Sequence, residues 1–212
     1  MKHLGIFIVA LFLFSCASNS SMSQKKEKGW VSIFNGKNFD GWKVTNDSPG
    51  TFTIEDGTIK VAGPRAHLFY EGPVGNHDFK NFAFKADIKT MPGANSGMFI
   101  HTAYQPDGWP AKGYEIQVNQ SHTDWRKTGS VYSFQDVKEV YAKDGEWYTE
   151  EIEVQGKHVT VKVNGKVIND YMEPETPKDP QKRLSHGTVA LQGHDPKSVI
   201  YYKNVMVKVL PD

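Results

Sequence analysis

Short runs in which apolar and polar residues alternate recur from residue 51 to the end of the chain. The runs 82–89, 158–163 and 205–209 each place an apolar residue at every second position, with mostly polar residues between. Successive side chains of a β-strand point to opposite faces, so this period is typical of strands with one buried face. The pattern therefore predicts at least three half-buried strands.

Tight turns separate several of these runs. Asp56-Gly57 lies between the runs 51–55 and 58–62, and Asn164-Gly165 follows the run 158–163. Asp-Gly and Asn-Gly pairs accept the positive φ angles that a two-residue hairpin turn requires. We therefore expect a β-hairpin at each of these positions.

No part of the mature chain has the period of a helix longer than two turns. Prolines interrupt the polar stretch at 174–180, which we expect to be a surface loop. About a dozen short strands without helices predict an all-β fold in which two sheets pack into a jelly-roll sandwich.

The segment 95–119 carries the most functional information. Two strand-like runs flank a loop rich in aromatic, Gly and Pro residues, and in the second run apolar residues alternate with Glu115, Gln117 and Asn119. A row of one carboxylate and two amides, beside a strand that ends in His101, predicts the floor of a polar cleft. The alternative is a plain exposed sheet face.

Glu115 is the first candidate for a general base, because burial beside aromatic rings would raise its pKa toward neutrality. His101 and His194 each end a strand beside a Gly-rich turn, and Gln192 shares the face of His194. Two such histidines could supply a proton donor and a proton acceptor. The alternatives are a surface glutamate and hydrogen-bonded structural histidines.

Two loops add candidate substrate contacts. The loop 121–132 contains His122, Lys127 and Tyr132, and a cation there could stabilise an oxyanion. A solvated charged hairpin is the commoner structure for such a loop. Tyr104 and Trp109, in the loop between the two strands of segment 95–119, could stack on the apolar faces of sugar rings.

We expect no metal and no cofactor. His101, His122, Asp124 and His194 do not have the spacing of a recognised metal motif. The chain also lacks a Gly-x-Ser-x-Gly nucleophile motif, a phosphate-binding Gly-rich loop and a dinucleotide fingerprint.

The N-terminus predicts a targeting segment. An apolar run at 4–14 follows a short positively charged start, and it is shorter than the about 20 residues that span a bilayer. It fits a secretory signal peptide over 1–15. Its end resembles the lipobox of bacterial lipoproteins, which predicts lipidation of Cys16, followed by a flexible tether over 16–29.

These features predict a single domain over residues 30–212, held at a membrane of the bacterial cell envelope by an N-terminal lipid. Cys16 is the only cysteine, so the domain has no internal disulfide. The chain has 25 basic and 24 acidic residues, and Lys2 is the only Lys or Arg within the predicted signal peptide. A mature chain of zero net charge does not favour nucleic acid as a partner.

Five motifs of the chain, taken in order, resemble the 3-keto-disaccharide hydrolase family over residues 30–209. They are 31–42 (Val-Ser-Ile-Phe-Asn-Gly-Lys-Asn-Phe-Asp-Gly-Trp), 95–101 (Asn-Ser-Gly-Met-Phe-Ile-His), 113–117 (Gly-Tyr-Glu-Ile-Gln), 127–132 (Lys-Thr-Gly-Ser-Val-Tyr) and 191–194 (Leu-Gln-Gly-His). The resemblance implies a concanavalin A-like sandwich with a substrate cleft on one sheet. It also implies a 3-keto-glycoside substrate, supplied by a partner sugar 3-dehydrogenase. One departure is His101, where many members carry Arg.

A ketone at C3 acidifies the C2 proton, so a base can start the elimination of the C1 oxygen, and water can then add to the double bond. On this hypothesis Glu115 or His194 is the base, and the other protonates the leaving oxygen. His101 or Lys127 lies near the enolate oxygen. Gln117 and Tyr132 orient hydroxyl groups, and the further substrate contacts are Tyr104, Trp109, His122 and Gln192.

Three other functions remain open from the sequence. A non-catalytic carbohydrate-binding module could have the same fold. An ordinary glycosidase would need two carboxyl groups facing each other across the cleft. A structural surface lipoprotein would need no small-molecule site.

Overall fold

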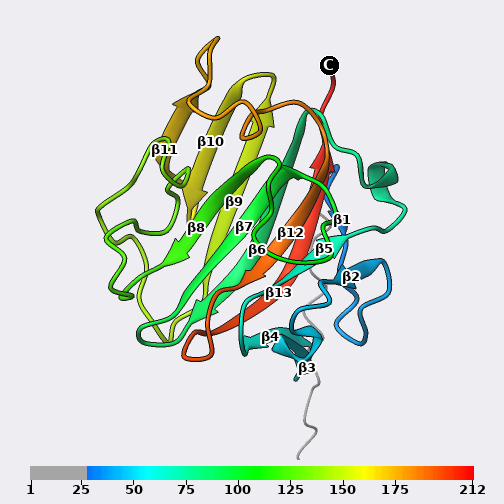
Figure 1. Ribbon diagram of the computed structural model, residues 1–212, viewed down its shortest axis with the longest axis vertical. Helices are drawn as coiled ribbons and strands as arrows, with labels where there is room; N and C mark the ends of the chain where they lie inside the picture. The colour runs from blue at the N-terminus through cyan, green and yellow to red at the C-terminus, as the bar shows by residue number, and fades with distance from the viewer. Residues whose placement is uncertain (1–27) are drawn as a thin grey trace, which may run out of the picture.

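The computed structural model describes residues 28–212, which form two antiparallel β-sheets packed face to face (Figure 1). The larger sheet has the order β11-β10-β9-β6-β13-β4-β3, with β1 paired to β13, and the smaller has the order β2-β5-β12-β7-β8. This confirms the predicted all-β sandwich of the jelly-roll type. The strands are β1 Val31–Ser32, β2 Trp42–Val44, β3 Phe52–Glu55, β4 Thr58–Ala62, β5 Ala66–Tyr70, β6 Phe82–Thr90, β7 Asn95–Thr102, β8 Tyr114–Asn119, β9 Tyr148–Gln155, β10 His158–Val163, β11 Lys166–Met172, β12 Thr188–Gly193 and β13 Val199–Val209.

The predicted signal peptide at 1–15, the lipidation site Cys16 and the predicted tether as far as residue 27 lie outside the described residues. Within residues 28–212 the helical segments are two short 3₁₀ turns, η1 (Pro49–Thr51) and η2 (Val74–His77). No helix in this range has the length and apolar character needed to cross a bilayer.

Both predicted hairpins are present. Asp56 and Gly57 have φ angles of 49° and 75° between β3 and β4, and Asn164 and Gly165 have φ angles of 50° and 78° between β10 and β11. Two successive positive φ angles match the twist of the flanking strands. The stretch 174–180 lies in an irregular connection between β11 and β12, as predicted.

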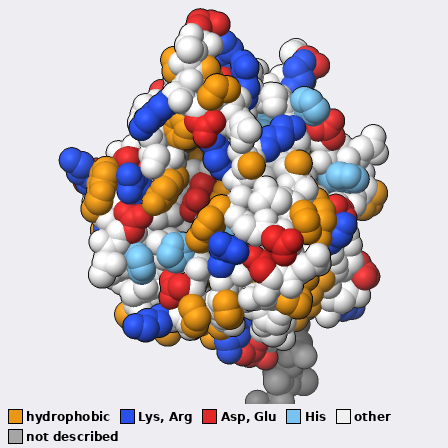
Figure 2. Space-filling view, in the orientation of Figure 1, with side chains coloured by type: hydrophobic (Ala, Val, Ile, Leu, Met, Phe, Trp, Pro, Cys, Tyr) orange, Lys and Arg blue, Asp and Glu red, His pale blue; other side chains and the backbone are white. Residues whose placement is uncertain are grey.

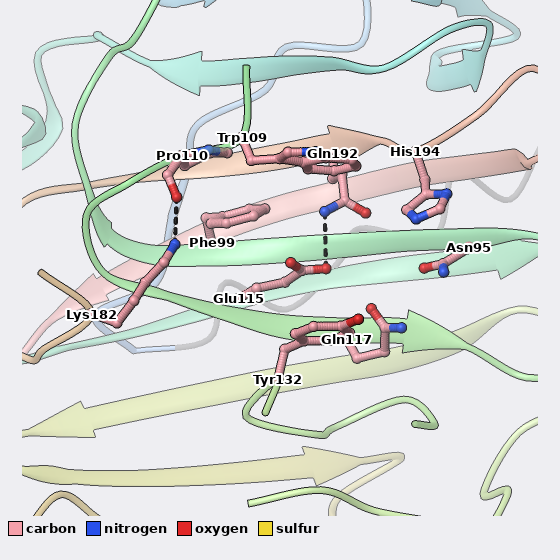
Figure 3. A pocket seen from close by; sticks show the side chains of 10 residues that line it. All are labelled: Asn95, Phe99, Trp109, Pro110, Glu115, Gln117, Tyr132, Lys182, Gln192 and His194. Atoms are coloured by element: carbon pink, nitrogen blue, oxygen red, sulfur yellow. Dashed lines mark hydrogen bonds between the residues drawn. The ribbon is translucent and has the colours of Figure 1, made fainter. Parts of the chain in front are cut away.

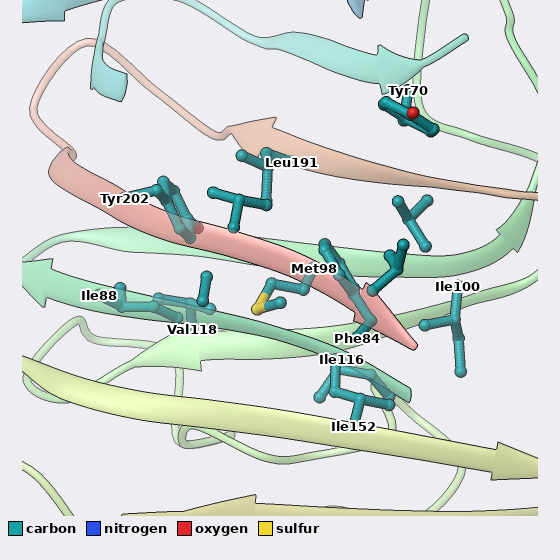
Figure 4. Packing of buried hydrophobic residues seen from close by; sticks show 14 of the residues in the cluster. Tyr70, Phe84, Ile88, Met98, Ile100, Ile116, Val118, Ile152, Leu191 and Tyr202 are labelled. Carbon is teal, nitrogen blue, oxygen red and sulfur yellow. The ribbon is translucent and has the colours of Figure 1, made fainter. Parts of the chain in front are cut away.

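The core lies between the two sheets (Figure 4). Met98, Ile116 and Leu191 from the smaller sheet belong to the same buried cluster as Phe84 and Ile152 from the larger sheet, and all five side chains are fully buried. Burying a side chain of this size contributes about 1.5–3 kcal/mol. Because side chains alternate along each strand, the neighbours of these core residues face outward from the smaller sheet, and there they form the candidate site.

Candidate active site

The outer face of the smaller sheet carries a polar row drawn from three adjacent strands (Figure 3). On β8, Glu115 pairs in register with Phe99 of β7, and Gln117 pairs with Gly97. Gln192 of β12 lies on the other side of β7 and completes the row. The alternation predicted from residues 114–119 is therefore confirmed, because Tyr114, Ile116 and Val118 face the core.

Loops from distant parts of the sequence enclose this row in a cavity of about 340 Å³. Trp109 and Pro110 come from the loop between β7 and β8, Lys182 from the connection between β11 and β12, and His194 directly follows β12. Figure 2 shows acidic, hydrophobic and histidine side chains gathered around a hollow on this face. The complete lining is Asn95, Phe99, Trp109, Pro110, Glu115, Gln117, Tyr132, Lys182, Gln192 and His194.

Tyr132 is held over Glu115 by backbone hydrogen bonds along the outer edge of β8. The amides of Thr128, Gly129 and Tyr132 donate to the carbonyls of Asn119 (3.0 Å), Gln117 (2.9 Å) and Glu115 (3.0 Å), respectively. The segment 128–132 thus covers an edge that would otherwise expose unpaired backbone groups. The Tyr132 hydroxyl donates to Asp124 Oδ2 at 3.2 Å.

Two amide side chains hold the carboxyl group of Glu115 by the same oxygen atom. Gln192 Nε2 donates to Oε1 at 2.9 Å. In the amide orientation that satisfies both of its partners, Gln117 Nε2 donates to Oε1 at 3.1 Å and to the Ser96 carbonyl at 3.0 Å. These bonds leave Oε2 as the oxygen that can carry a proton.

Burial raises the pKa of Glu115 to about 7, although the hydrogen bond from Gln192 and the positive charge of Lys182 act in the opposite direction. Burial lowers the pKa of Lys182 itself, and the charge of Glu115 raises it. The Lys182 ammonium also donates to the Pro110 carbonyl across the cavity rim. At neutral pH the cavity therefore contains a carboxyl group that can either give or take a proton.

His194 is oriented by the residue that follows it. Its Nδ1 lies 2.9 Å from Asp195 Oδ2, and a carboxylate can only accept at that distance, so Nδ1 carries the proton. Asp195 in turn accepts from Ser198 Oγ at 2.6 Å and from the Lys197 amide at 2.8 Å. Burial acts to raise the pKa of Asp195, but the hydrogen bonds from Ser198, His194 and Lys197 outweigh it and lower that pKa to about 2. This arrangement leaves the Nε2 lone pair of His194 available as a base.

His122 lies beside His194, with ring centroids 5.6 Å apart. Its Nδ1 accepts a hydrogen bond from the Asp124 amide at 3.0 Å and lies 3.3 Å from Asn95 Nδ2. A neutral His122 therefore carries its proton on Nε2 and is a donor there.

His122, His194 and Asp195 place potential metal-ligand atoms within 4.8 Å of one another. With His122 Nδ1 already an acceptor, its Nε2 carries the proton, so that in this hydrogen-bonding pattern lone pairs are offered by His194 Nε2 and the Asp195 carboxylate but not by His122.

Trp109 forms one wall of the cavity, and its side chain is 46% exposed. The indole meets the rings of His67 and His194 at centroid distances of 5.5 Å each, and the Arg65 guanidinium lies 5.5 Å from its centroid. The ring is thus fixed by three neighbours and remains partly exposed at the cavity, as a stacking platform requires.

The structure does not bring His101 to the cavity. Its side chain is fully buried against Phe82, its Nε2 lies 2.9 Å from the Lys80 carbonyl, and its Nδ1 accepts from the Ser185 amide at 3.1 Å. Both ring nitrogens are thus occupied, and burial lowers the pKa of His101 to about 4. The predicted position near an enolate oxygen is wrong, since His101 is a neutral structural residue.

Lys127 and Tyr104 also lie outside the cavity lining. The Lys127 ammonium donates to the carbonyls of His122 at 2.9 Å and Asp124 at 3.0 Å, so it holds the loop that carries them. Tyr104 packs against Phe69, and the Lys43 ammonium lies 3.6 Å from its ring centroid. Their predicted contacts with substrate are replaced by structural roles.

Sequence reasoning missed five residues of this site, namely Asn95, Phe99, Pro110, Lys182 and Asp195. Asn95 begins the strand that was predicted to end in His101, and Asp195 directly follows His194, so proximity in sequence to a candidate was an available signal for both. Lys182 lies in a proline-rich polar connection far from the other residues in sequence, and no local pattern identifies it.

A family model described as "3-keto-alpha-glucoside-1,2-lyase-like domain" matches residues 29–208. The chain belongs to this family. It is 29% identical over 169 residues to a 3-keto-disaccharide hydrolase of Bacteroides thetaiotaomicron, a match that covers 68% of this chain and 58% of that protein. The present chain thus matches less than two thirds of that relative's length.

Solved structures also resemble the fold, and two of them illustrate the range. A putative glycosyl hydrolase from Parabacteroides distasonis has a TM-score of 0.71 and 26% identity, covering 86% of this chain and 94% of that one. A carbohydrate-binding module from Bacillus subtilis has a TM-score of 0.53 and 14% identity, covering 79% and 95%. The second similarity shows the fold alone. The expected membership of the 3-keto-disaccharide hydrolase family is confirmed.

Proposed function

We propose that this member of the family cleaves the glycosidic bond of 3-keto-glycosides by elimination and hydration. The observation that carries the proposal is a single cavity in which a carboxyl group of raised pKa, Glu115, lies with an imidazole, His194, that is fixed in one tautomer by Asp195. Elimination next to a ketone needs one base, one acid and one donor to the enolate oxygen. Trp109 supplies a ring face on which a sugar can stack.

The carboxyl groups argue against an ordinary glycosidase. Such enzymes place two carboxyl groups on either side of the scissile bond. Among the residues of the described chain that line the cavity, Glu115 alone carries a carboxyl group. The nearby Asp124 accepts from the Tyr132 hydroxyl, and Asp195 is bound to His194 and Ser198.

We assign His194 as the base that removes the C2 proton. Its Nε2 has a lone pair because Nδ1 donates to Asp195. Once protonated, the imidazolium would be stabilised by the Asp195 carboxylate, whose low pKa keeps it ionised. His194 thus acts as the base, and the neighbouring Asp195 carboxylate orients it and stabilises its charged form.

We assign Glu115 as the acid that protonates the leaving oxygen. Oε1 accepts from both Gln192 and Gln117, so the proton of the neutral acid belongs on Oε2. A pKa of about 7 leaves a large fraction of this group protonated at neutral pH.

The order of groups along the cavity matches the order of the reacting atoms. Figure 3 shows Lys182 at one end, Glu115 in the middle, and His194 with Asn95 toward the other end. The leaving oxygen on C1 would then lie near Glu115 and Lys182, the C2 proton near His194, and the C3 oxygen near His122. His122 is not among the residues that line the cavity, but its ring lies 5.6 Å from that of His194, and in this proposal its Nε2 proton is the donor to the enolate oxygen.

The proposed reaction has two stages, elimination and hydration. His194 takes the C2 proton, an enolate forms at C3, the bond from C1 to the leaving oxygen breaks, and Glu115 protonates that oxygen. Water then adds to C1 and gives a proton to the Glu115 carboxylate, while the protonated His194 returns a proton to C2. The net reaction is hydrolysis, and both side chains regain their initial states.

The test is to incubate the purified protein with a 3-keto-glucoside and with its unoxidised parent, and to follow release of the aglycone. Only the oxidised compound should react. In D₂O the product should carry deuterium at C2 to the extent that the protonated His194 exchanges with solvent before it returns a proton. Equal release from both compounds would overturn the proposal.

A carbohydrate-binding module remains the second candidate, and the fold shared with the Bacillus subtilis module favours it. A lack of release from either compound, with retained binding of the sugar, would support that alternative.

We also propose that a sugar 3-dehydrogenase supplies the substrate, and that Cys16 carries a lipid which holds the protein at the bacterial cell envelope. Fatty-acid labelling that survives Cys16→Ser substitution would contradict the lipid anchor.

A further inference from the structure

A second cavity of about 470 Å³ adjoins the first. Tyr132 and Lys182 line both cavities, so these two residues form the boundary between them. The remaining lining comes from Ser133, Phe134, Lys178, Asp179 and Pro180. The two cavities therefore meet at the end where the leaving oxygen lies in the proposed reaction.

Three of the seven residues that line the second cavity carry apolar rings, and two of these rings pack against neighbours. The Phe134 ring packs at centroid distances of 4.7 Å from Tyr114 and 6.5 Å from Tyr171. The Tyr132 ring lies under the Arg126 guanidinium, 4.7 Å from its centroid. Pro180 adds a third apolar ring without a rotatable side chain.

Several polar groups of this cavity already have partners in the protein. Asp179 Oδ1 accepts from the Gln181 amide at 2.9 Å, and the Tyr132 hydroxyl donates to Asp124. A pyranose ring displays hydroxyl groups around its rim and would need hydrogen-bond partners for them. The surface offers apolar rings, the Ser133 hydroxyl, the Asp179 carboxylate and two ammonium groups, those of Lys178 and Lys182, so that its positive charges outnumber its negative one.

We propose that the second cavity binds the leaving group of the glycoside, and that it selects an aromatic aglycone with a phenolic or anionic oxygen. This inference rests on the proposed function. The aromatic ring would stack between Phe134 and Pro180, and the lysines would face its negatively polarised oxygen atoms. The 3-keto sugar then occupies the first cavity, and the bond to be cleaved lies beside Tyr132 and Lys182.

The test compares the kcat/KM values of phenyl and methyl 3-keto-glucosides in the wild-type protein and in Phe134→Leu. The ratio of kcat/KM for the phenyl compound to kcat/KM for the methyl compound should fall about five- to tenfold in the variant, because the stacking contact is lost. The intrinsic reactivity of each leaving group is the same for both proteins and cancels in this comparison.

A second variant covers the case in which Phe134→Leu unfolds, since Phe134 packs against the core residue Tyr114. Lys178 is exposed, so Lys178→Glu should fold normally, and it should lower kcat/KM for a 4-carboxyphenyl 3-keto-glucoside relative to the phenyl compound about tenfold. Lys143→Glu is the control, because Lys143 is exposed and lies outside both cavities.

Suppose that both variants fold and still cleave every compound. If the phenyl-to-methyl ratio in Phe134→Leu and the 4-carboxyphenyl-to-phenyl ratio in Lys178→Glu are then the same as in the wild-type protein, this inference is overturned while the proposed function stands. If Phe134→Leu lowers kcat/KM for a 3-keto-disaccharide as much as for the phenyl compound, or more, the cavity binds a second sugar. That result would also overturn the aromatic assignment. A lack of cleavage of every 3-keto-glycoside by the wild-type protein would instead overturn the proposed function, and with it this inference.

Discussion

At the scale of single residues, the proton positions in the cavity follow from hydrogen bonds more than from residue type. Two amides hold one oxygen of Glu115, and one carboxylate fixes the tautomer of His194. A histidine and a glutamate in a cleft could exchange the roles of acid and base. In the proposed mechanism the hydrogen-bond partners of each group separate those roles.

The substitution Glu115→Gln tests which role Glu115 has. If Glu115 is the acid, the variant should lose about 10²–10⁴-fold in kcat with a methyl leaving group. It should lose much less with a 4-nitrophenyl leaving group, which departs without a proton. The activity of the wild-type protein should also fall as pH rises through about 7, because the acid loses its proton there.

Equal losses for both leaving groups, with activity rising through pH 7, would show that Glu115 is the base. Glu139→Gln is the matched control, because Glu139 is exposed and lies outside the cavity lining.

At the scale of elements, the absence of a side chain at Gly97 of β7 makes room for the carboxyl group of Glu115 on β8. A Cβ atom at Gly97 would lie 2.7 Å from Glu115 Oε1, 2.8 Å from Cγ and 3.0 Å from Cδ. These distances are shorter than real contacts allow. Glycine at this point of β7 therefore permits the Glu115 side chain to lie flat across the sheet.

Gly97→Ala should displace the Glu115 side chain while the sheet still forms. We expect kcat/KM to fall about 10²-fold, since small misplacements of a reacting group have effects of that size, and stability to fall by about 1–3 kcal/mol. Thermal unfolding and kinetics measure the two effects. Gly50→Ala is the control, because a Cβ there meets nothing within 4 Å.

The double variant Gly97→Ala/Glu115→Ala separates this clash from a general effect on β7. Once the Glu115 side chain is truncated, Gly97→Ala should cost little further stability. Additive losses in the double variant would mean that the added methyl group acts on something other than Glu115.

Alternation along the strands predicted most elements from sequence, and its exceptions have physical causes. β9 was missed because its inward face includes the buried Glu150, which breaks the apolar pattern. β5 was missed because all five of its residues are buried, so it shows no period of two. Strand pairing itself brought Glu115, Gln117 and Gln192 together as expected.

The sequence could not distinguish His101 from His194, since both end a strand beside a Gly-rich turn. The backbone decides between them, because His101 has a φ angle of 52° and its ring is buried against Phe82. Lys182 could not be found for a different reason. Its position depends on how a long irregular connection folds over a sheet that is distant in sequence.

At the scale of the whole molecule, buried histidines link stability to pH. Burial lowers the pKa of His101 to about 4 and that of His67 to about 3. Both are neutral in the folded protein, while in the unfolded chain they gain protons below pH 6.5. Their contribution to stability is therefore complete above pH 6.5 and is lost as pH falls toward 4 and 3.

We expect His101 alone to account for about 3 kcal/mol of stability lost between pH 6.5 and 4. In His101→Gln, whose amide can still donate to the Lys80 carbonyl and accept from the Ser185 amide, the free energy of unfolding should depend less on pH over this range. Urea titrations at several pH values measure the slope. An unchanged slope would mean that His101 is not the group responsible.

Three chain segments that are far apart in sequence form the rim of the site, while the floor belongs to the sheet. The connections at 103–113 and 173–187 can change in length or composition without altering the strand pairing that places Glu115. The connection 120–147 is constrained, because its segment 128–132 pairs with β8. A register shift of one residue would turn that carboxyl group into the core and would prevent folding. Exchange of the two unconstrained connections among relatives could therefore diversify the compounds they accept, while the sheet keeps the same carboxyl group at the floor.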